Sequence, residues 1–152
     1  MQTYARLFGT GPRGLAISLT MLAGAGALEE TLGWPAVHGH AEFGAVVFGI
    51  SIVITLMGMG WSLQSLPVES RGRDLITTGA FRYARHPLYA SVLLSFDFGL
   101  ALYLDNWLYV AWAVVQLPLW HVNVIGEERL MHREFGDAYT NYCRNTGRFL
   151  PK

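Results

Sequence analysis

The chain has 152 residues, the length of a single domain. It is 52% hydrophobic and only 14% charged, with a mean hydropathy of +0.29. This balance is high for a soluble domain and typical of a membrane protein. The single cysteine, Cys143, excludes an internal disulfide and any metal site that needs several cysteine ligands. We therefore expect an all-α integral membrane protein, with no metal centre.

The first two apolar runs are candidate membrane helices. Residues 15–28 are few for a span of roughly 20 residues, and this run follows two arginines as a secretion signal would. We interpret it as a retained helix that extends toward residue 32. Residues 43–63 are long enough to cross. Glycines in this second run predict close packing against another helix: Gly44, Gly49, Gly58 and Gly60.

The next two runs form a predicted helical hairpin. The third span covers about residues 88–104, and the fourth covers about residues 107–125. A turn at Asp105 and Asn106 joins them. Asp97 lies near the middle of the third span, where a carboxylate is costly unless it faces the interior of the bundle. Asp97 is therefore either a functional residue or a protonated or hydrogen-bonded structural one.

The tail after the fourth span has the pattern of an amphipathic helix. From Glu127 to Tyr142 its apolar side chains recur mainly at spacings of three and four. Several arginines keep it out of the hydrocarbon. Gly136 weakens the middle, so two short helices are an alternative. From Gly147 onward we expect extended or turned chain.

The positive charges define an orientation. All 11 Lys and Arg residues, Arg6 and Arg71 among them, lie before the first span, between the second and third spans, or in the tail. With four spans these segments share one face, which the positive-inside rule makes cytoplasmic. We expect both termini to be cytoplasmic, in a bacterial inner membrane or an equivalent. One membrane domain, 1–152, then comprises the first two spans (1–63), a cytoplasmic connector (64–86), the hairpin (87–126) and a cytoplasmic tail (127–152).

A candidate site begins where the connector meets the third span. Arg82, Arg85 and His86 offer hydrogen-bond donors to an anion, and the N-terminus of the following helix adds its positive dipole. Pro87 fits the first turn of that helix, and Tyr83 and Tyr89 offer aromatic faces. Arginine and tyrosine alone could equally be ordinary interfacial anchors.

Two carboxylates give this segment a partner. Glu127 and Glu128 follow the fourth span, so the hairpin returns them to the level of His86. A pocket with a positive and a negative side suits a zwitterion. A small ligand with a carboxylate, an amine and an aromatic base would match every element.

Together these residues resemble those of the superfamily of isoprenylcysteine carboxyl methyltransferases and phospholipid methyltransferases. The resemblance covers roughly the C-terminal half and is specific as an ordered set. One departure is Ala80, where the motif usually has proline after glycine. The residues that carry the resemblance are 79–89, Glu127 to Leu130, Phe135, Gly136, Tyr139, Tyr142 and Arg148 to Pro151.

The resemblance implies an integral-membrane methyltransferase that uses S-adenosylmethionine, with the tail closing over the cofactor. On this view His86 and Arg85 meet the methionine carboxylate, and Glu127 or Glu128 meets the amine or the ribose. The expected cofactor-binding residues are Gly79, Tyr83, Arg85, His86, Pro87, Leu88, Tyr89, Glu127 and Glu128. The expected catalytic residues are Arg85, His86, Glu128 and Arg148.

The sequence leaves the methyl acceptor open. An isoprenylcysteine-like carboxylate, a phospholipid amine and a hydrophobic thiol all remain, and the expected partners are lipids or lipophilic molecules, not nucleic acid. An amine or thiol must lose a proton, with which Glu128, His86 or Asp97 could assist. A membrane reductase using NADPH, of the sterol reductase type, is one alternative; a non-catalytic membrane subunit is another.

Overall fold

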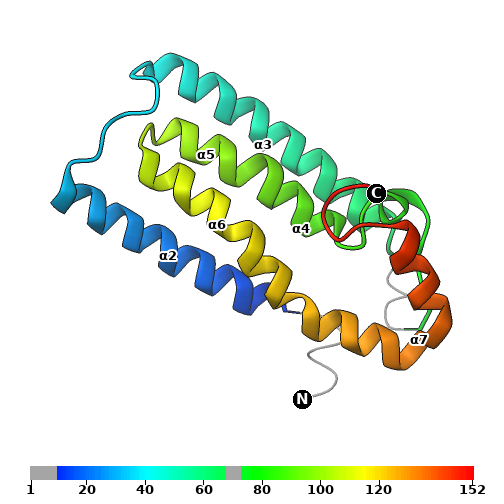
Figure 1. Cartoon of the computed structure of the whole chain (residues 1–152). Coiled ribbons are helices and arrows are strands. Elements are labelled where there is room, and N and C mark those ends of the chain that lie inside the picture. The colour runs from blue at the N-terminus through cyan, green and yellow to red at the C-terminus, as the bar shows by residue number, and fades with distance from the viewer. Residues whose placement is uncertain (1–9, 68–72) are drawn as a thin grey trace.

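The computed structural model of the chain describes residues 10–67 and 73–152. Arg6 and Arg71, which contribute to the predicted orientation, lie outside these ranges. Within them the chain is helical, and a tight bundle of long helices leads into a bent helix at one end (Figure 1). The expectation of an all-α membrane bundle is confirmed.

The first two predicted spans are long helices. Helix α2 covers Gly11–Leu32 and helix α3 covers Ala41–Gln64. Both are long and apolar enough to cross a membrane. Helix α2 has proline in its first turn and ends at Gly33, whose left-handed backbone lets its N–H close onto the Glu29 carbonyl at 3.0 Å. The first span is thus longer at both ends than its apolar run.

The third predicted span is a rod of three consecutive elements: α4 (Pro87–Ser91), η3 (Val92–Phe96) and α5 (Asp97–Tyr103). It is shorter than the other candidate spans, at about 25 Å. Element η3 is a π-helical turn in which the Asp97 N–H donates to the Val92 carbonyl. Such turns change the direction of the side chains that follow.

The fourth span is helix α6, Trp107–Asn123, which the Asn106 side chain caps by accepting from the Leu108 N–H at 3.0 Å. Helix α7, Ile125–Asn145, follows almost directly. Its backbone leaves helical geometry at Gly136, where φ is 52°. The predicted amphipathic tail helix and its weak point are therefore confirmed.

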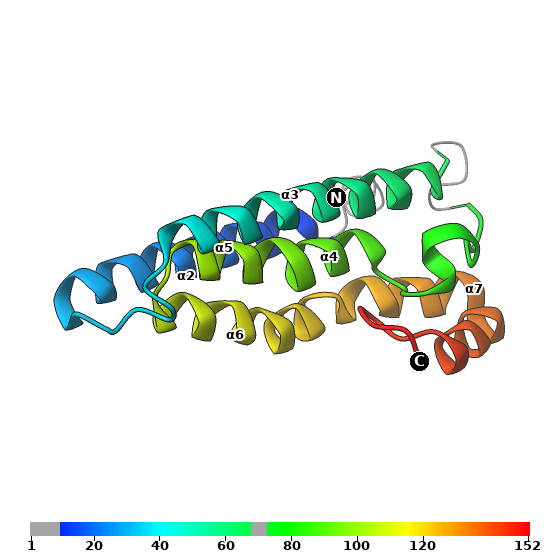
Figure 2. The same cartoon turned by 90° about the horizontal axis from the view of Figure 1, so that it is seen from above.

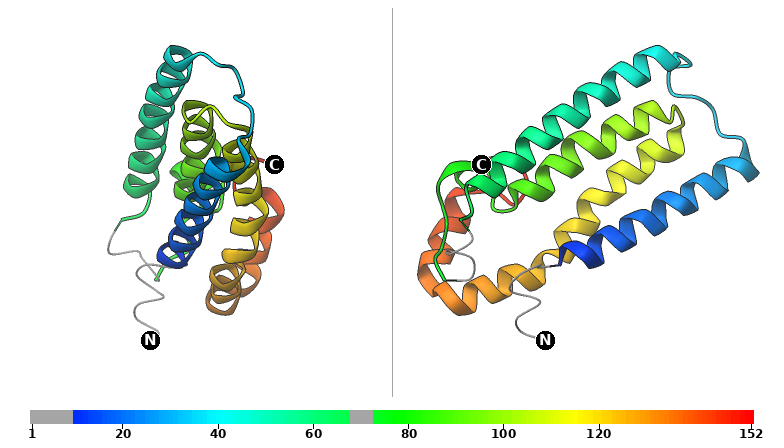
Figure 3. Two further views of the ribbon diagram at one scale, coloured as in Figure 1. Left: turned by 90° about the vertical axis from the view of Figure 1, so that its left-hand side faces the viewer. Right: turned by 180° about the vertical axis from the view of Figure 1, so that it is seen from behind.

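The long helices lie side by side in the order α3, α4–α5, α6 and α2 (Figure 3). Small residues let α3 approach its neighbour closely: a side chain at Gly58 would collide with Ser91, and one at Gly44 with the Leu102 carbonyl. The packing prediction was wrong for Gly49 and Gly60, which have nothing within 4 Å. These two glycines lie on an open face of α3.

Helix α6 has buried residues in both apolar clusters of the bundle. One cluster lies toward the short Asp105 turn and the other toward α7, and large aromatic side chains from α6 fill both. The first contains Ala25, Ala101, Tyr109, Trp112 and Ala113. The second contains Ala90, Leu93, Trp120, Val124 and Phe149.

Several segments meet at the α7 end of the bundle. The connector forms a short 3-10 helix, η2 (Gly79–Arg82), before α4. After α7 the chain turns back, and its last residues lie beside the start of α4 (Figure 2). The Arg85 N–H donates to the Gly147 carbonyl at 2.8 Å, and the His86 N–H donates to the Arg148 carbonyl at 3.0 Å. This pairing fixes the tail against the candidate site.

Candidate active site

The structure brings His86 between the two neighbouring glutamates, as the hairpin argument predicts. His86 Nδ1 lies 3.5 Å from Glu127 Oε2, and His86 Nε2 lies 3.5 Å from Glu128 Oε1. The His86 side chain is 11% exposed. His86 and Glu127, 41 positions apart in the sequence, thus belong to one cluster at the boundary of the membrane bundle.

Glu128 is held by two guanidinium groups. Arg85 Nε donates to Glu128 Oε1 at 2.9 Å, and Arg148 donates to Glu128 Oε2 through Nε at 2.9 Å and Nη2 at 2.6 Å. Burial by itself would raise the pKa of Glu128, but His86 and the two arginines outweigh it and hold that pKa well below its ordinary range. Glu128 raises the pKa of Arg148 in turn. Near neutral pH Glu128 is therefore an anion and a poor proton acceptor.

Arg85 also holds the end of α7. Its Nη1 donates to the Thr146 carbonyl at 2.6 Å and to the Cys143 carbonyl at 3.3 Å. These carbonyls lie at the helix C-terminus, where a cation is favourable. Its Nη2 lies 2.8 Å from Glu128 Oε1, so all three nitrogens of the Arg85 guanidinium are engaged within the protein.

Glu127 has a different set of partners. Its Oε1 accepts from the Thr10 hydroxyl at 2.6 Å, from the Thr10 N–H and from the Tyr89 hydroxyl at 3.0 Å. Its Oε2 accepts no hydrogen bond from the described residues and has only His86 Nδ1 near it, at 3.5 Å. One carboxylate oxygen of Glu127 is therefore available to another donor.

The His86 ring lies between aromatic side chains. It stacks on Tyr89 with ring centres 5.7 Å apart, and Phe149 lies 6.0 Å away on the tail. Tyr89 contacts Trp120 of α6, with ring centres 4.7 Å apart. His86 Nε2 is buried and makes no hydrogen bond in the described part of the chain, with Glu128 Oε1 3.5 Å away. An unsatisfied buried nitrogen is costly, which makes it a candidate contact for a ligand.

Two tyrosines of α7, Tyr139 and Tyr142, lie beside the connector. The Tyr142 hydroxyl donates to the Phe81 carbonyl at 2.5 Å and so holds η2 against the tail. Tyr139 is 2% exposed and packs on Tyr142. Burial raises the pKa of both hydroxyls. They stay protonated and act as donors and packing groups.

Other predicted residues lie apart from the glutamates. Tyr83 is 50% exposed and packs on Trp61 of α3, with ring centres 5.6 Å apart. Gly79 has a φ of 60°, which favours glycine, and lies against Ser65. Pro87 is buried in the first turn of α4, next to Leu88. The structure thus shows a backbone role for Gly79 and Pro87 and no contact between Tyr83 and the cluster.

Asp97 lies deeper in the bundle. It is 5% exposed and accepts no hydrogen bond from the described residues. It precedes Ala101 by one turn of α5, and Ala101 packs in one cluster with residues of α6. Eight residues of helix separate it from Tyr89, a rise of about 12 Å. Asp97 therefore faces the interior of the bundle, at a distance from the glutamates.

Sequence reasoning missed the contribution of α2. Thr10, at the start of α2, donates twice to Glu127, and Asn123 Nδ2 donates to the Thr10 carbonyl at 3.3 Å. The only local signal was Pro12, which marks a helix start and so places Thr10 just before one. That signal does not reveal which distant carboxylate lies beside it.

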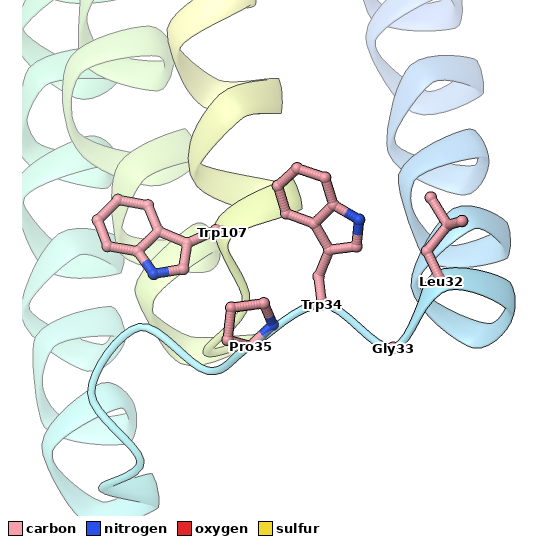
Figure 4. A pocket seen from close by; sticks show the side chains of 5 residues that line it. All are labelled: Leu32, Gly33, Trp34, Pro35 and Trp107. Carbon is pink, nitrogen blue, oxygen red and sulfur yellow. The ribbon is translucent and has the colours of Figure 1, made fainter.

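A surface hollow occurs at the opposite end of the bundle. It has a volume of about 370 Å³ and is lined by Leu32, Gly33, Trp34, Pro35 and Trp107 (Figure 4). Its lining contains no ionisable side chain. Two tryptophans at a helix end are typical of the membrane interface. The hollow therefore carries no chemistry comparable to that of the glutamate cluster.

The fold and the cluster define a multi-pass integral membrane protein with a polar site where its helix ends meet. The family model described as phospholipid methyltransferase matches residues 41–138, more than half of the chain. The chain belongs to this family, which is part of the superfamily of integral-membrane methyltransferases that the sequence resembles. No curated protein matches the chain.

Membership settles the class of reaction. Members of the family are methyltransferases that use S-adenosylmethionine as methyl donor. This places the chain with the methyltransferases, and not with the reductases or non-catalytic membrane subunits that the sequence left open. The matched range contains α3 to α6 and most of α7, with His86 and both glutamates. It does not contain α2 or the tail after residue 138.

Proposed function

We propose that the protein transfers the methyl group of S-adenosylmethionine to the amine of a lipid headgroup, with Glu127 and His86 at the centre of the site. The observation that carries this proposal is the unmet hydrogen-bonding capacity of these two side chains. Among the described residues Glu127 Oε2 accepts no hydrogen bond and His86 Nε2 makes none, although each lies 3.5 Å from an ion-pair partner. Glu127 Oε2 can accept a further hydrogen bond, and His86 Nε2 can donate one to an anion.

This pair fits the amino-acid part of S-adenosylmethionine. An ammonium group would pair with Glu127, and a carboxylate would pair with His86, so a zwitterion satisfies both residues. Tyr89 and Trp120 supply aromatic surface beside them for a base. Because the His86 ring is largely buried, binding requires the imidazole or the Thr10 contact to move. When bound, S-adenosylmethionine supplies an electrophilic methyl group on a sulfonium.

The two glutamates would then have different tasks. Glu128 has both oxygens engaged by guanidinium groups and a strongly lowered pKa, so it positions Arg85 and Arg148 and accepts no proton. Glu127 has a free oxygen and neutral hydroxyl donors. We therefore assign to Glu127, next to His86, the pairing with the ammonium group of the cofactor.

The tail would exclude water from the reaction. Phe149 is 4% exposed and lies against both His86 and His121. Arg148 ties the same segment to Glu128. A methyl transfer gains mainly from holding the nucleophile in line at near contact distance in a dry site. The tail and the arginines serve that positioning.

An amine acceptor is supported by the family to which the chain belongs, phospholipid methyltransferase. The test is methyl transfer by the purified protein in lipid nanodiscs, with labelled S-adenosylmethionine. Three acceptors are supplied separately: phosphatidylethanolamine, a farnesylated cysteine analogue with a free carboxylate, and a long-chain thiol. We expect label on the phospholipid nitrogen. Label on the carboxylate or the thiol alone would overturn the proposed acceptor.

We also infer that the site faces the cytoplasm. Arg13 lies at the start of α2, and the other described basic residues lie in the connector or in and after α7. The loop before α3 and the Asp105 turn, at the opposite end, contain none. Fusion of a periplasm-dependent reporter after residue 36 should give activity, and the same reporter after residue 152 should give none. The reverse pattern would invert the topology.

A further inference from the structure

Helix α2 lies outside the range that the family model matches, yet it contacts the candidate site. It packs on α6, and only a few of its residues are buried: Gly14, Ser18 and Ala25. A helix with so little buried surface depends on specific contacts for its position. Those contacts are polar at both Thr10 and Ser18.

Ser18 is the centre of a buried hydrogen-bond junction. Its hydroxyl donates to Gln116 Oε1 at 2.8 Å and accepts from Trp120 Nε1 at 3.1 Å. Its carbonyl accepts from Trp112 Nε1 at 3.1 Å. Gln116 is fully buried and Ser18 is 8% exposed. In the membrane interior each of these bonds lacks competition from water, so the junction fixes the orientation of Trp120.

Trp120 also contacts the residues of the candidate site. Its ring packs on Tyr89 at 4.7 Å, and the Tyr89 hydroxyl donates to Glu127 at 3.0 Å. Tyr89 also stacks on His86. A change in the tilt of Trp120 therefore alters the side chains that flank both unpartnered groups of the site.

Gly14 makes this arrangement possible. A side chain at Gly14 would collide with the Trp120 ring and with the Asn123 amide. One turn earlier, Thr10 bonds directly to Glu127 and accepts from Asn123. Thr10, Gly14 and Ser18 recur every four residues, so one face of α2 contacts the site along two turns.

We propose that α2 is a positioning element of the methyltransferase site, in which Ser18 acts through Trp120 and Tyr89 on cofactor binding. The inference rests on the proposed function, because it assumes that Tyr89 and Glu127 contact the cofactor. Thr10, at the start of the same helix, contacts Glu127 directly. Neither residue reacts with substrate.

The experiment is calorimetric titration of the purified protein in detergent with S-adenosylhomocysteine. Ser18→Ala removes both hydrogen bonds of the hydroxyl, and we expect it to weaken binding about fivefold at unchanged stoichiometry. Ser18→Thr, which keeps the hydroxyl, should restore the affinity. In methyl transfer, Ser18→Ala should raise the KM for S-adenosylmethionine and leave kcat nearly unchanged. A purely structural role would instead lower the stoichiometry and leave the affinity of the remaining protein intact.

The matched control is Ser95→Ala. The Ser95 hydroxyl also bridges two helices, donating to the Ser51 carbonyl at 3.1 Å, but on the side of the rod that faces α3. Ser95→Ala should leave the affinity unchanged. A double-mutant cycle adds a second measurement: in a Trp120→Phe background, which lacks the donor, Ser18→Ala should have no further effect.

The outcomes separate the two proposals. If the wild-type protein does not bind S-adenosylhomocysteine, the proposed site fails. If the wild-type protein binds and Ser18→Ala binds equally well, the site stands and the positioning role of α2 is wrong. Equal effects of Ser18→Ala with and without the Trp120 indole N–H would also overturn it.

Discussion

The two ends of the bundle both gather hydrogen-bond donors around carboxylates, but with different results. At the end of the bundle opposite α7, called the far end below, Asp105 accepts from the backbone N–H groups of Val37, His38 and Gly39 at 2.9–3.0 Å. Glu29 accepts there from Asn106 and from the Tyr109 hydroxyl. These donors are mostly neutral, and they hold a loop and a turn together. The far end is a structural clasp.

At the α7 end the carboxylates face two guanidiniums and an imidazole. In the described part of the chain both oxygens of Glu128 accept hydrogen bonds, whereas one oxygen of Glu127 and one buried nitrogen of His86 make none. A structural clasp uses the hydrogen-bonding capacity of its members, while a binding site retains some of it for a ligand. That difference, and not the number of polar residues, distinguishes the functional end.

Glu128→Gln should have the largest effect, because it removes the charge that compensates Arg85 and Arg148. Glu128 is 7% exposed, and breaking one partner of a buried ion pair costs about 3 kcal/mol or more. We expect a strongly lowered unfolding midpoint in detergent and loss of methyl transfer. Asp137→Asn, on the exposed side of the same helix, is the control and should change neither. A fully stable Glu128→Gln protein would contradict the structural role of the triad.

His86→Phe should have the second largest effect. Phenylalanine keeps the aromatic contact with Tyr89 and removes both ring nitrogens. If His86 donates to a ligand carboxylate, the loss of that charged hydrogen bond should weaken S-adenosylhomocysteine binding about tenfold or more. Calorimetry checks this. Unchanged affinity would remove His86 from the cofactor site.

Acid should destabilise the α7 end through Glu128. Its pKa is lowered in the folded protein, so it contributes stability above its ordinary value of 4.5, and that stability is lost as the pH falls further toward the folded pKa. Thermal unfolding measured from pH 7 to pH 3 should show a steep loss below about pH 4.5 in the wild-type protein. The loss should be shallower in Glu128→Gln. Parallel curves would show that other groups control the acid response.

Asp105→Asn should have the smallest effect on the site. Asparagine tolerates the left-handed backbone at this position, where φ is 52°, but it weakens the three backbone contacts. We expect a modest fall in the unfolding midpoint and no change in affinity for S-adenosylhomocysteine. A change in affinity would show that the two ends are coupled, and that the contrast between them is incomplete.

Much of the arrangement could be predicted because it depends on local patterns. Apolar run lengths located the spans, and a two-residue turn required Glu127 to return beside His86. Glycine marked the kink at residue 136. These features follow from the length of a span, from chain continuity and from backbone sterics.

The remaining features depend on packing between helices distant in sequence. Thr10 meets Glu127 only because α2 packs on α6, and no spacing rule relates residues 117 positions apart. Tyr83 follows one turn of 3-10 helix and packs on Trp61, a contact between distant residues that no local pattern predicts. The π-helical turn before Asp97 likewise has no signature in the sequence. Such details are set by tertiary contacts that override local preference.

The most direct test of the central claim is titration of wild-type and Glu127→Gln proteins with S-adenosylhomocysteine, with Asp105→Asn as the far-end control. Glu127→Gln keeps an oxygen for Thr10 and Tyr89 but removes the charge that a ligand ammonium needs. We predict binding by the wild type and by Asp105→Asn, and an affinity about tenfold or more lower for Glu127→Gln at unchanged stoichiometry. Equal affinity in all three proteins would contradict the placement of the cofactor at Glu127 and His86.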